Sequence, residues 1–208
     1  MTLPRLKIAW IALLTIAFLW FSAWYGGAGK PISAEEGERL LEQIRQTYPE
    51  AEDSERNFLS NIQEMIPRDD GKEFYAVNLE DLKEGPEARQ SDRAYAKIVA
   101  PLLLKRAGHP VFLSDRAGLM LGQYGNQVDR VAVVRYRSLR DLIDMAIDPA
   151  MQAGEVHKFG ALNHTEVFIT RPTITFMHIR VTLALILIII GWLGLRGMNW
   201  MNRRQQSS

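Results

Sequence analysis

Hydrophobic positions along the chain form two long apolar stretches that bracket a mixed, patterned middle. Residues 8–25 form an uncharged run of 18 residues, which as a helix would be about 27 Å long at 1.5 Å per residue. This length nearly matches the hydrocarbon core of a bilayer, which is about 30 Å thick. Trp20, Trp24 and Tyr25 crowd one end of the run, as amphipathic rings do at a membrane interface. The pattern predicts a transmembrane helix over residues 8–25.

A cleaved signal peptide is the alternative interpretation of this first stretch. Arg5 and Lys7 form a basic start, and the small residues 26–28 could serve as a cleavage site. However, the apolar run is longer than the core of a typical signal peptide and is rich in tryptophan. We therefore expect an uncleaved anchor.

The second apolar stretch, residues 181–195, is denser but has only 15 residues. Extended back to Phe176, with the Arg180 side chain reaching toward the interface, it attains about 20 residues, which is enough to span a bilayer. The alternative is a buried core helix of a soluble protein. Residues 183–190 are apolar on every side, with no polar stripe to face water. The pattern therefore predicts a second transmembrane helix over residues 176–195.

Basic residues flank both predicted spans and indicate an orientation. Residues 1–7 contain two basic residues before the first span, and residues 196–208 contain three after the second. Both segments are therefore predicted to be cytoplasmic, which places the middle of the chain outside, in the periplasm if the cell is Gram-negative. Arg171 and Arg180 lie on the other side and do not follow this rule. We expect a two-pass protein of the bacterial inner membrane, with the lipid bilayer as its first partner.

After the first span, residues 30–70 are predicted to form a helical linker region. Ser33 and Glu36 have the spacing of a capping box and start a helix that Pro49 ends. Residues 54–65 show the apolar periodicity of a second amphipathic helix. We expect this helical pair to pack on the following domain or to connect it to the membrane. Binding of a partner protein is the alternative.

Residues 73–172 contain short runs of β-branched and aromatic residues separated by longer helical patterns. Strands are predicted at residues 73–79, 110–113, 130–136 and 165–170, with a further short strand at 119–121. Helices are predicted at residues 91–107 and 138–162, the second restarting at Asp148-Pro149. The order strand, helix, strand, strand, helix, strand predicts an α+β, ferredoxin-like βαββαβ domain with an N-terminal helical extension, between two transmembrane helices.

The charge distribution excludes one class of function. Residues 30–171 contain 19 basic and 24 acidic residues, so this part of the chain has a net charge of −5. A nucleic-acid-binding domain needs a basic face. We therefore expect no nucleic-acid partner. The chain contains no cysteine, which excludes disulfides, thiolate metal sites and cysteine nucleophiles.

Three segments of the middle are typical of a known family: residues 92–95 (DRAY), residues 130–138 (RVAVVRYRS) and residues 148–151 (DPAM), the last followed by His157, Lys158, Ala161 and Leu162. On these segments, residues 74–172, just under half of the chain, resemble the dimeric α+β barrel superfamily and especially an uncharacterised bacterial domain family within it. The resemblance implies a sheet with one face on two helices and the other face against a second copy. Relatives in this superfamily include haem-binding enzymes and cofactor-independent enzymes that use oxygen.

The third predicted strand favours such pairing independently of the resemblance. Two sets of side chains alternate along it: Val131, Val133 and Arg135 with Ala132, Val134 and Tyr136. Both faces of the strand are therefore substantially apolar, but helices can cover only one of them. An apolar second face needs a partner, a ligand or the membrane. We expect a homodimer formed through the sheet face.

Candidate ligand-binding residues lie on predicted strands and in the last helix of the domain: Tyr75, Asn78, Arg135, Tyr136 and His157. Their mixture of polar and apolar groups would suit a small ligand in a shared cavity. Core packing and dimer contacts are the alternative, with His157 as a surface or structural histidine. His157 has no acidic or histidine partner four residues further on, so no local metal-binding pair forms. We expect no metal and no cofactor, and no catalytic residue stands out.

These patterns support three hypotheses of function. The leading one is a membrane-anchored protein that displays a dimeric ferredoxin-like domain for binding a partner or a small ligand. The second is a membrane-bound enzyme of the monooxygenase or isomerase type found in this superfamily, with a cavity around Tyr75, Tyr136 and His157. The third is an accessory subunit of a membrane complex, which docks on membrane-protein partners through its two spans.

Overall fold

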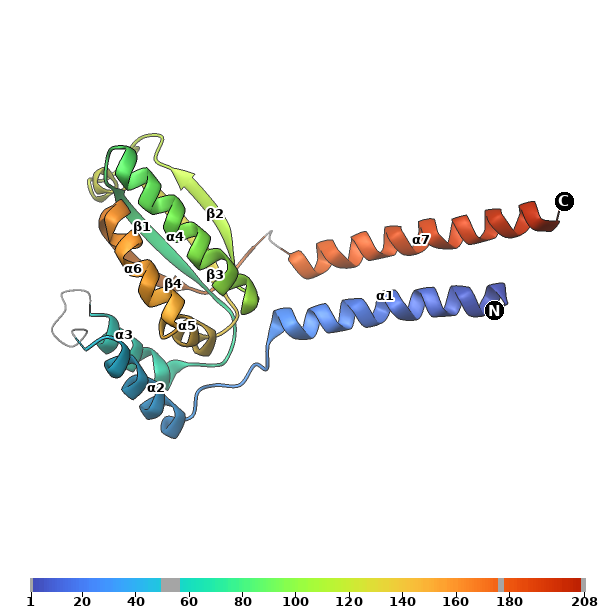
Figure 1. Ribbon diagram of the computed structural model, residues 1–208, viewed down its shortest axis with the longest axis horizontal. Coiled ribbons are helices and arrows are strands. Elements are labelled where there is room, and N and C mark those ends of the chain that lie inside the picture. The colour runs from blue at the N-terminus through green and yellow to red at the C-terminus, as the bar shows by residue number, and fades with distance from the viewer. Residues whose placement is uncertain (1, 50–56, 176–177, 207–208) are drawn as a thin grey trace. The chain divides into compact units, whose positions relative to one another are not determined.

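The computed structural model describes residues 2–49, 57–175 and 178–206 of the 208-residue chain. The chain divides into two compact units (Figure 1). One joins the two ends of the chain, Met1–Gly26 and Ile174–Ser208, and is the helical unit. The other, Gly27–Thr173, contains the sheet and is the sheet domain.

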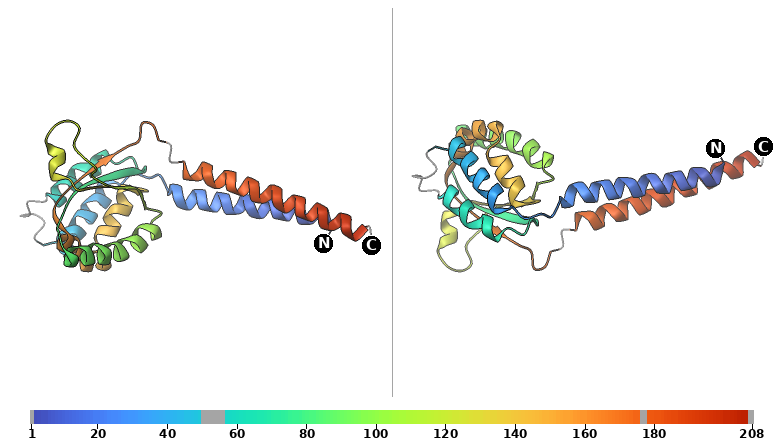
Figure 2. Two further views of the ribbon diagram at one scale, coloured as in Figure 1. Left: turned by 90° about the horizontal axis from the view of Figure 1, so that it is seen from above. Right: turned by 90° about the horizontal axis from the view of Figure 1, so that it is seen from below.

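The helical unit consists of α1, Leu3–Gly26, and α7, Ile179–Gln206. Among the described residues, these are the two helices that are long and apolar enough to cross a membrane. They lie side by side and run antiparallel, so that both chain termini are at the same end of the pair (Figures 1 and 2). Both helices extend beyond the predicted spans, and the predicted start at Phe176 lies outside the described residues.

The sheet domain begins with a helical extension whose elements are α2, Ala34–Thr47, α3, Phe58–Met65, and the 3-10 helix η1, Ile66–Arg68. Ser33 caps α2 as predicted, because its hydroxyl accepts a hydrogen bond from the backbone N–H of Glu36. The helix predicted over residues 54–65 begins at Phe58, and residues 54–56 lie outside the described residues.

The strands of the sheet domain are β1, Phe74–Leu82, β2, His109–Asp115, β3, Arg130–Tyr136, and β4, Leu162–Thr170. In the described part of the chain they form one four-stranded antiparallel sheet in the order β2-β3-β1-β4. This order and the intervening helices confirm the predicted α+β, ferredoxin-like arrangement.

The helices between the strands are α4, Pro86–Lys105, α5, Leu139–Ala146, and α6, Pro149–Ala161. Helix α4 starts five residues before the predicted position, because Pro86 is well suited to the first turn and Gly85 supplies the positive φ of 99° that precedes it. The strand predicted at residues 119–121 was wrong. This segment is irregular and leads into the 3-10 helix η2, Tyr124–Gln127, because it has no neighbouring strand to pair with.

One apolar cluster joins the helical extension to the rest of the sheet domain. Its buried members come from the segment before α2, from α2, α3 and η1, and from β1 and α5: Ile32, Leu40, Leu41, Ile44, Leu59, Ile62, Ile66, Phe74, Leu139 and Ile143. Tyr48 adds a polar contact, since its hydroxyl donates to the carbonyl of Ala146 at 2.6 Å. The extension therefore packs on the domain as part of its core.

The two segments that connect the sheet domain to the helical unit leave it from the same end of the sheet. Gly27, its first residue, lies against the side chain of Arg137, immediately after β3. Thr170, the last residue of β4, pairs with Tyr75 at the start of β1. Because β1 begins where β3 and β4 end, both connections emerge together.

The start of α5 offers a test of local capping. The Ser138 hydroxyl accepts from the Asp141 backbone N–H and donates to its carboxylate at 2.9 Å. Ser138→Ala is expected to destabilise the sheet domain by about 1 kcal/mol, lowering its melting temperature by about 2–4 °C. Differential scanning calorimetry of the full chain in detergent measures this. Ser138→Thr keeps the hydroxyl and should preserve most of the stability. An unchanged Ser138→Ala melting temperature would exclude the cap as a stabilising contact.

Candidate functional site

Among the described elements of the sheet domain, helices cover one face of the sheet and leave the other face uncovered. In the register of the central strands, Phe74, Ala76 and Glu80 of β1 lie on the helix-covered face, where Phe74 belongs to the core. The intervening residues Tyr75 and Val77 point to the opposite face. In Figure 2 helices α4 and α6 lie on one side of the sheet and the loop containing η2 lies on the other. The second face is the open face.

The centre of the open face is apolar. The register assigns it side chains from each of the four strands: Tyr75, Val77 and Leu79 of β1, Phe112 of β2, Val131 and Val133 of β3, and Phe168 of β4. The β3 valines are half-buried by their neighbours on the sheet, whereas Phe112 is 55% exposed and Phe168 is 44% exposed. A contiguous apolar surface of this kind is typical of an interaction site.

The loop between β2 and β3 borders the open face. Tyr124 in η2 donates a hydrogen bond to the carboxylate of Glu166, a β4 residue on the open face. This hydrogen bond raises the pKa of the Tyr124 hydroxyl above its usual value. Further along the loop, Met120 and Leu121 are almost completely exposed. The loop therefore adds apolar side chains beside the edge of the same surface.

Two of the predicted site residues, Tyr75 and Arg135, are neighbours at one end of the open face. Arg135 is only 1% exposed. Its guanidinium donates to Glu73 at 2.8 Å and to the carbonyl of Ala107 at 2.7 Å. Burial and the nearby Glu73 carboxylate raise the pKa of Tyr75, and Arg135 opposes them. The Arg135 side chain thus holds the ends of β1, α4 and β3 together.

The other strand candidates lie on the opposite face, beneath the helices. Asn78 donates through its amide to the carbonyl of Ala132 at 3.0 Å. Tyr136 stacks on Phe74 with ring centroids 5.5 Å apart, and its burial raises its pKa. Both residues contribute to the packing between sheet and helices.

The five candidates therefore do not surround one cavity. Tyr75 pairs with Arg135 and therefore shares its face of the sheet. Tyr136 is the next residue along β3 and pairs with Phe74, so Tyr136 lies on the opposite face from Tyr75. His157 is half-exposed on α6. Among the described residues, no group of three or more histidine or carboxylate side chains could hold a metal ion.

A buried ionic network on the helix-covered face was not found from the sequence. Arg130 at the start of β3 donates to Glu80 of β1 at 2.6 Å and to both oxygens of Asp92 of α4 at 3.0 and 2.7 Å. Glu80 is only 8% exposed. Asp92 and Arg130 both lie in the segments that resemble the dimeric α+β barrel superfamily. Their place in these segments was the one sequence feature that could have pointed to the network. The network joins two strands to a helix.

The network makes stability depend on pH. The hydrogen bond from Arg130 holds the pKa of Asp92 below its ordinary value of 3.8. A depressed folded-state pKa adds stability that is present above the unfolded value and is lost as the pH falls through the folded one. Asp92→Asn is therefore expected to weaken the decline of the melting temperature between pH 5 and pH 2. Thermal unfolding across this range measures it. Asp115→Asn, at an exposed carboxylate, is the control. An equal fall of the melting temperature between pH 5 and pH 2 in wild type and Asp92→Asn would contradict the expectation.

Comparison with known proteins identifies the fold. No protein-family model matches the chain, and no curated protein matches it. The crystal structure of the RPA0582 protein of unknown function from Rhodopseudomonas palustris is similar at 17% identity and a TM-score of 0.51, covering 56% of this chain and 94% of that protein. The methylated form of RPA0582 is similar at 16% identity and a TM-score of 0.50, covering 57% and 93%.

A dimeric ferredoxin-like protein of unknown function from Jannaschia sp. is similar at 12% identity and a TM-score of 0.38, covering 48% of this chain and 99% of that one. At 17% and 16% identity, the similarity to the two RPA0582 structures establishes the fold alone. The sheet domain is an α+β domain of the ferredoxin-like class.

Proposed function

We propose that this chain is a membrane-anchored protein that displays its ferredoxin-like domain for association with a second copy of itself. The observation that supports the proposal is the open face. Within the described part of the sheet domain, helices cover one side of the sheet, and the other side presents Val77, Val133 and Phe168 with no helix of the domain above them. Burial of such a surface is favourable by about 25 cal/mol for each Å² of apolar area removed from water.

A second copy suits this face better than an unrelated partner does. A two-fold interface brings the same surface of both subunits together, so an apolar sheet face meets a surface of matching chemistry. The resemblance of residues 74–172 to the dimeric α+β barrel superfamily implies the same pairing. A shared space between two such sheets is also where a small ligand would bind. Of the five candidate residues, Tyr75 and Arg135 have register positions at the end of this face, and the Arg135 side chain is already enclosed by its contacts with Glu73 and Ala107.

The membrane part of the proposal rests on the helical unit and on the connections to it. Helices α1 and α7 are long and apolar enough to span a bilayer, and both connections leave the sheet domain at one end. We place residues 8–25 and 176–195 in the membrane, and residues 1–7 and 196–208 in the cytoplasm. Residues 30–70 and 73–172 then lie outside, in the periplasm of a Gram-negative bacterium. The excess of basic residues beyond the two spans supports this orientation.

The absence of cysteine from the sequence allows a clean test of the topology. Glu87→Cys places a thiol on the exposed first turn of α4, and Thr2→Cys places one at the exposed N-terminus. In intact spheroplasts, a membrane-impermeant maleimide should label Glu87→Cys and should label Thr2→Cys only after the membrane is opened. Labelling of Thr2→Cys in intact cells would overturn the orientation. Extraction of the protein by carbonate, without detergent, would overturn membrane insertion itself.

Oligomeric state is tested on the full chain in a mild detergent. Native mass spectrometry is expected to show a dimer of 23.7 kDa chains. A monomer at micromolar concentration would overturn the proposed pairing. Additional subunits that co-purify in stoichiometric amounts would instead favour an accessory role in a larger membrane complex.

A further inference from the structure

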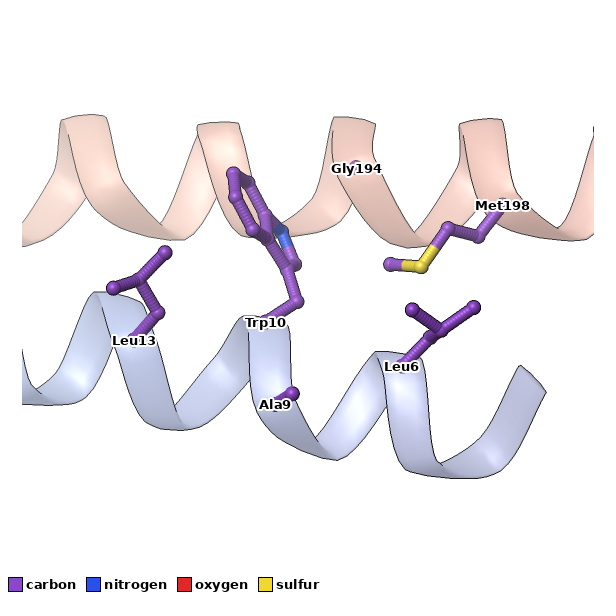
Figure 3. A pocket seen from close by; sticks show the side chains of 6 residues that line it. All are labelled: Leu6, Ala9, Trp10, Leu13, Gly194 and Met198. Carbon is purple, nitrogen blue, oxygen red and sulfur yellow. The ribbon is translucent and has the colours of Figure 1, made fainter. Parts of the chain in front are cut away.

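A groove lies between α1 and α7 near the end of the helical unit that holds both chain termini (Figure 3). Its volume is about 390 Å³, and its lining is apolar: Leu6, Ala9, Trp10, Leu13, Gly194 and Met198. The indole of Trp10 stands between the helices against Gly194, and Ala9 and Gly194 contribute almost no side-chain volume. The groove therefore forms where the Trp10 side chain separates the two helices and Ala9 and Gly194 are too small to fill the space.

The lining of the groove offers one polar side-chain atom, the Trp10 indole nitrogen, whereas an ordered water needs two to four polar partners. The indole nitrogen of Trp10 is buried and has no hydrogen-bond acceptor among the described residues. The other lining side chains are aliphatic or thioether groups, and empty apolar cavities stay dry because water gains no hydrogen bonds there. An alkyl chain fits this chemistry.

Cations from both helices surround the same end. Arg5 and Lys7 flank Leu6 in the sequence, so they lie beside the groove lining on α1. On α7, Arg203 and Arg204 follow Met198 by five and six residues, about 8 Å further along the helix. The sequence has no carboxylate side chain before residue 35 or after residue 166, so none in the helical unit offsets these charges. The groove therefore continues into a strongly positive region.

We propose that this groove binds one acyl chain of an anionic phospholipid, whose headgroup is held by the basic residues at the ends of α1 and α7. The inference rests on the membrane placement proposed above, but not on dimerisation. A second copy of the same helix pair is a poorer occupant, because it would bring its own basic side chains against these. A zwitterionic lipid would fill the groove but would bring no net negative charge to the cations.

The test is native mass spectrometry of the full chain in a mild detergent, titrated with dioleoylphosphatidylglycerol or dioleoylphosphatidylcholine. The expected result is one bound phosphatidylglycerol per chain, with an affinity at least about tenfold above that of phosphatidylcholine. The double substitution Arg203→Gln and Arg204→Gln should lower the affinity for phosphatidylglycerol about 30-fold, because each cation contributes a factor of about five. The same change should leave phosphatidylcholine affinity unaltered.

A groove-filling variant separates the acyl-chain contact from the charge contact. Ala9→Leu should lower the affinity for both lipids by at least about tenfold. The added side chain displaces several methylene groups of the acyl chain, and each buried methylene group contributes about fourfold to the affinity. Ala17→Leu makes the same change at an exposed α1 position outside the groove and should bind like wild type. Equal affinity for the two lipids, or Ala9→Leu binding like Ala17→Leu, would overturn the inference. If carbonate also extracts the protein without detergent, the proposed membrane placement is rejected together with the lipid site. If the protein resists carbonate, only the lipid site is rejected.

Discussion

Val133→Asp is expected to convert the proposed dimer into a folded monomer. Val133 lies near the middle of the open face, paired with Val77 of β1 on one side and with Phe112 of β2 on the other. In a dimer formed through this face, each copy would bury an unpaired carboxylate in an apolar interface. Such a charge costs about 3–5 kcal/mol, which raises the dissociation constant more than about 100-fold.

The monomer tolerates the same change because its open face is in contact with solvent. Val133 is already partly exposed there, so an aspartate can remain hydrated and the core beneath the opposite face is untouched. Light scattering after size exclusion measures the mass, and circular dichroism measures retention of the fold. Val156→Asp is the matched control, because it puts the same charge on the exposed outer surface of α6. A Val133→Asp protein that stays dimeric, or a Val156→Asp protein that dissociates, would contradict dimerisation through the sheet face.

Arg130→Met is expected to cause the largest loss of stability of any single substitution in the ionic network. Removal of the guanidinium would leave Glu80 buried and without its cation, and would leave Asp92 without both of its hydrogen bonds. Breaking a buried pair in this way costs about 3–5 kcal/mol. Chemical denaturation of the full chain in detergent measures the difference in the free energy of unfolding.

A double substitution distinguishes loss of the ion pair from a general packing defect. Glu80→Gln combined with Arg130→Met removes both charges, so it should recover a substantial part of the stability lost in Arg130→Met alone. Arg116→Met is the control, since Arg116 forms a partly exposed ion pair with Asp129 at 3.8 Å, and such pairs contribute about 0–1 kcal/mol. No recovery in the double variant would show that the side-chain volume of Arg130, rather than its charge, stabilises the domain.

The elements that the sequence predicted well are those specified by neighbouring residues. Residues 130–136 were predicted as a strand with the same bounds as β3, because a run of β-branched side chains in alternation is a local signal. The caps at Ser33, Ser138 and Asp148 were equally local, since each acts on a backbone N–H within three residues. The error at residues 119–121 has the complementary reason. These residues have strand-like side chains, but a strand also needs a neighbour with which to pair.

The candidate site was harder to predict because it depends on contacts between distant segments. Alternation indicated that Tyr136 and Arg135 face opposite ways, but the face that the helices cover was decided by packing, with Tyr136 and Phe74 in the core. The Arg130 network joins residues 38 and 50 positions apart, and no local spacing announces it.

The sequence by itself determined the two apolar helices, the order of strands and helices, and the acidic character of the middle. These follow from hydrophobic periodicity, side-chain propensity and charge, which are properties of short segments. Only the tertiary structure decided which sheet face stays open, which charges pair in the core, and that Trp10 meets Gly194 from the other end of the chain. These features depend on how distant segments pack, because burial and pairing arise only when the chain has brought them together.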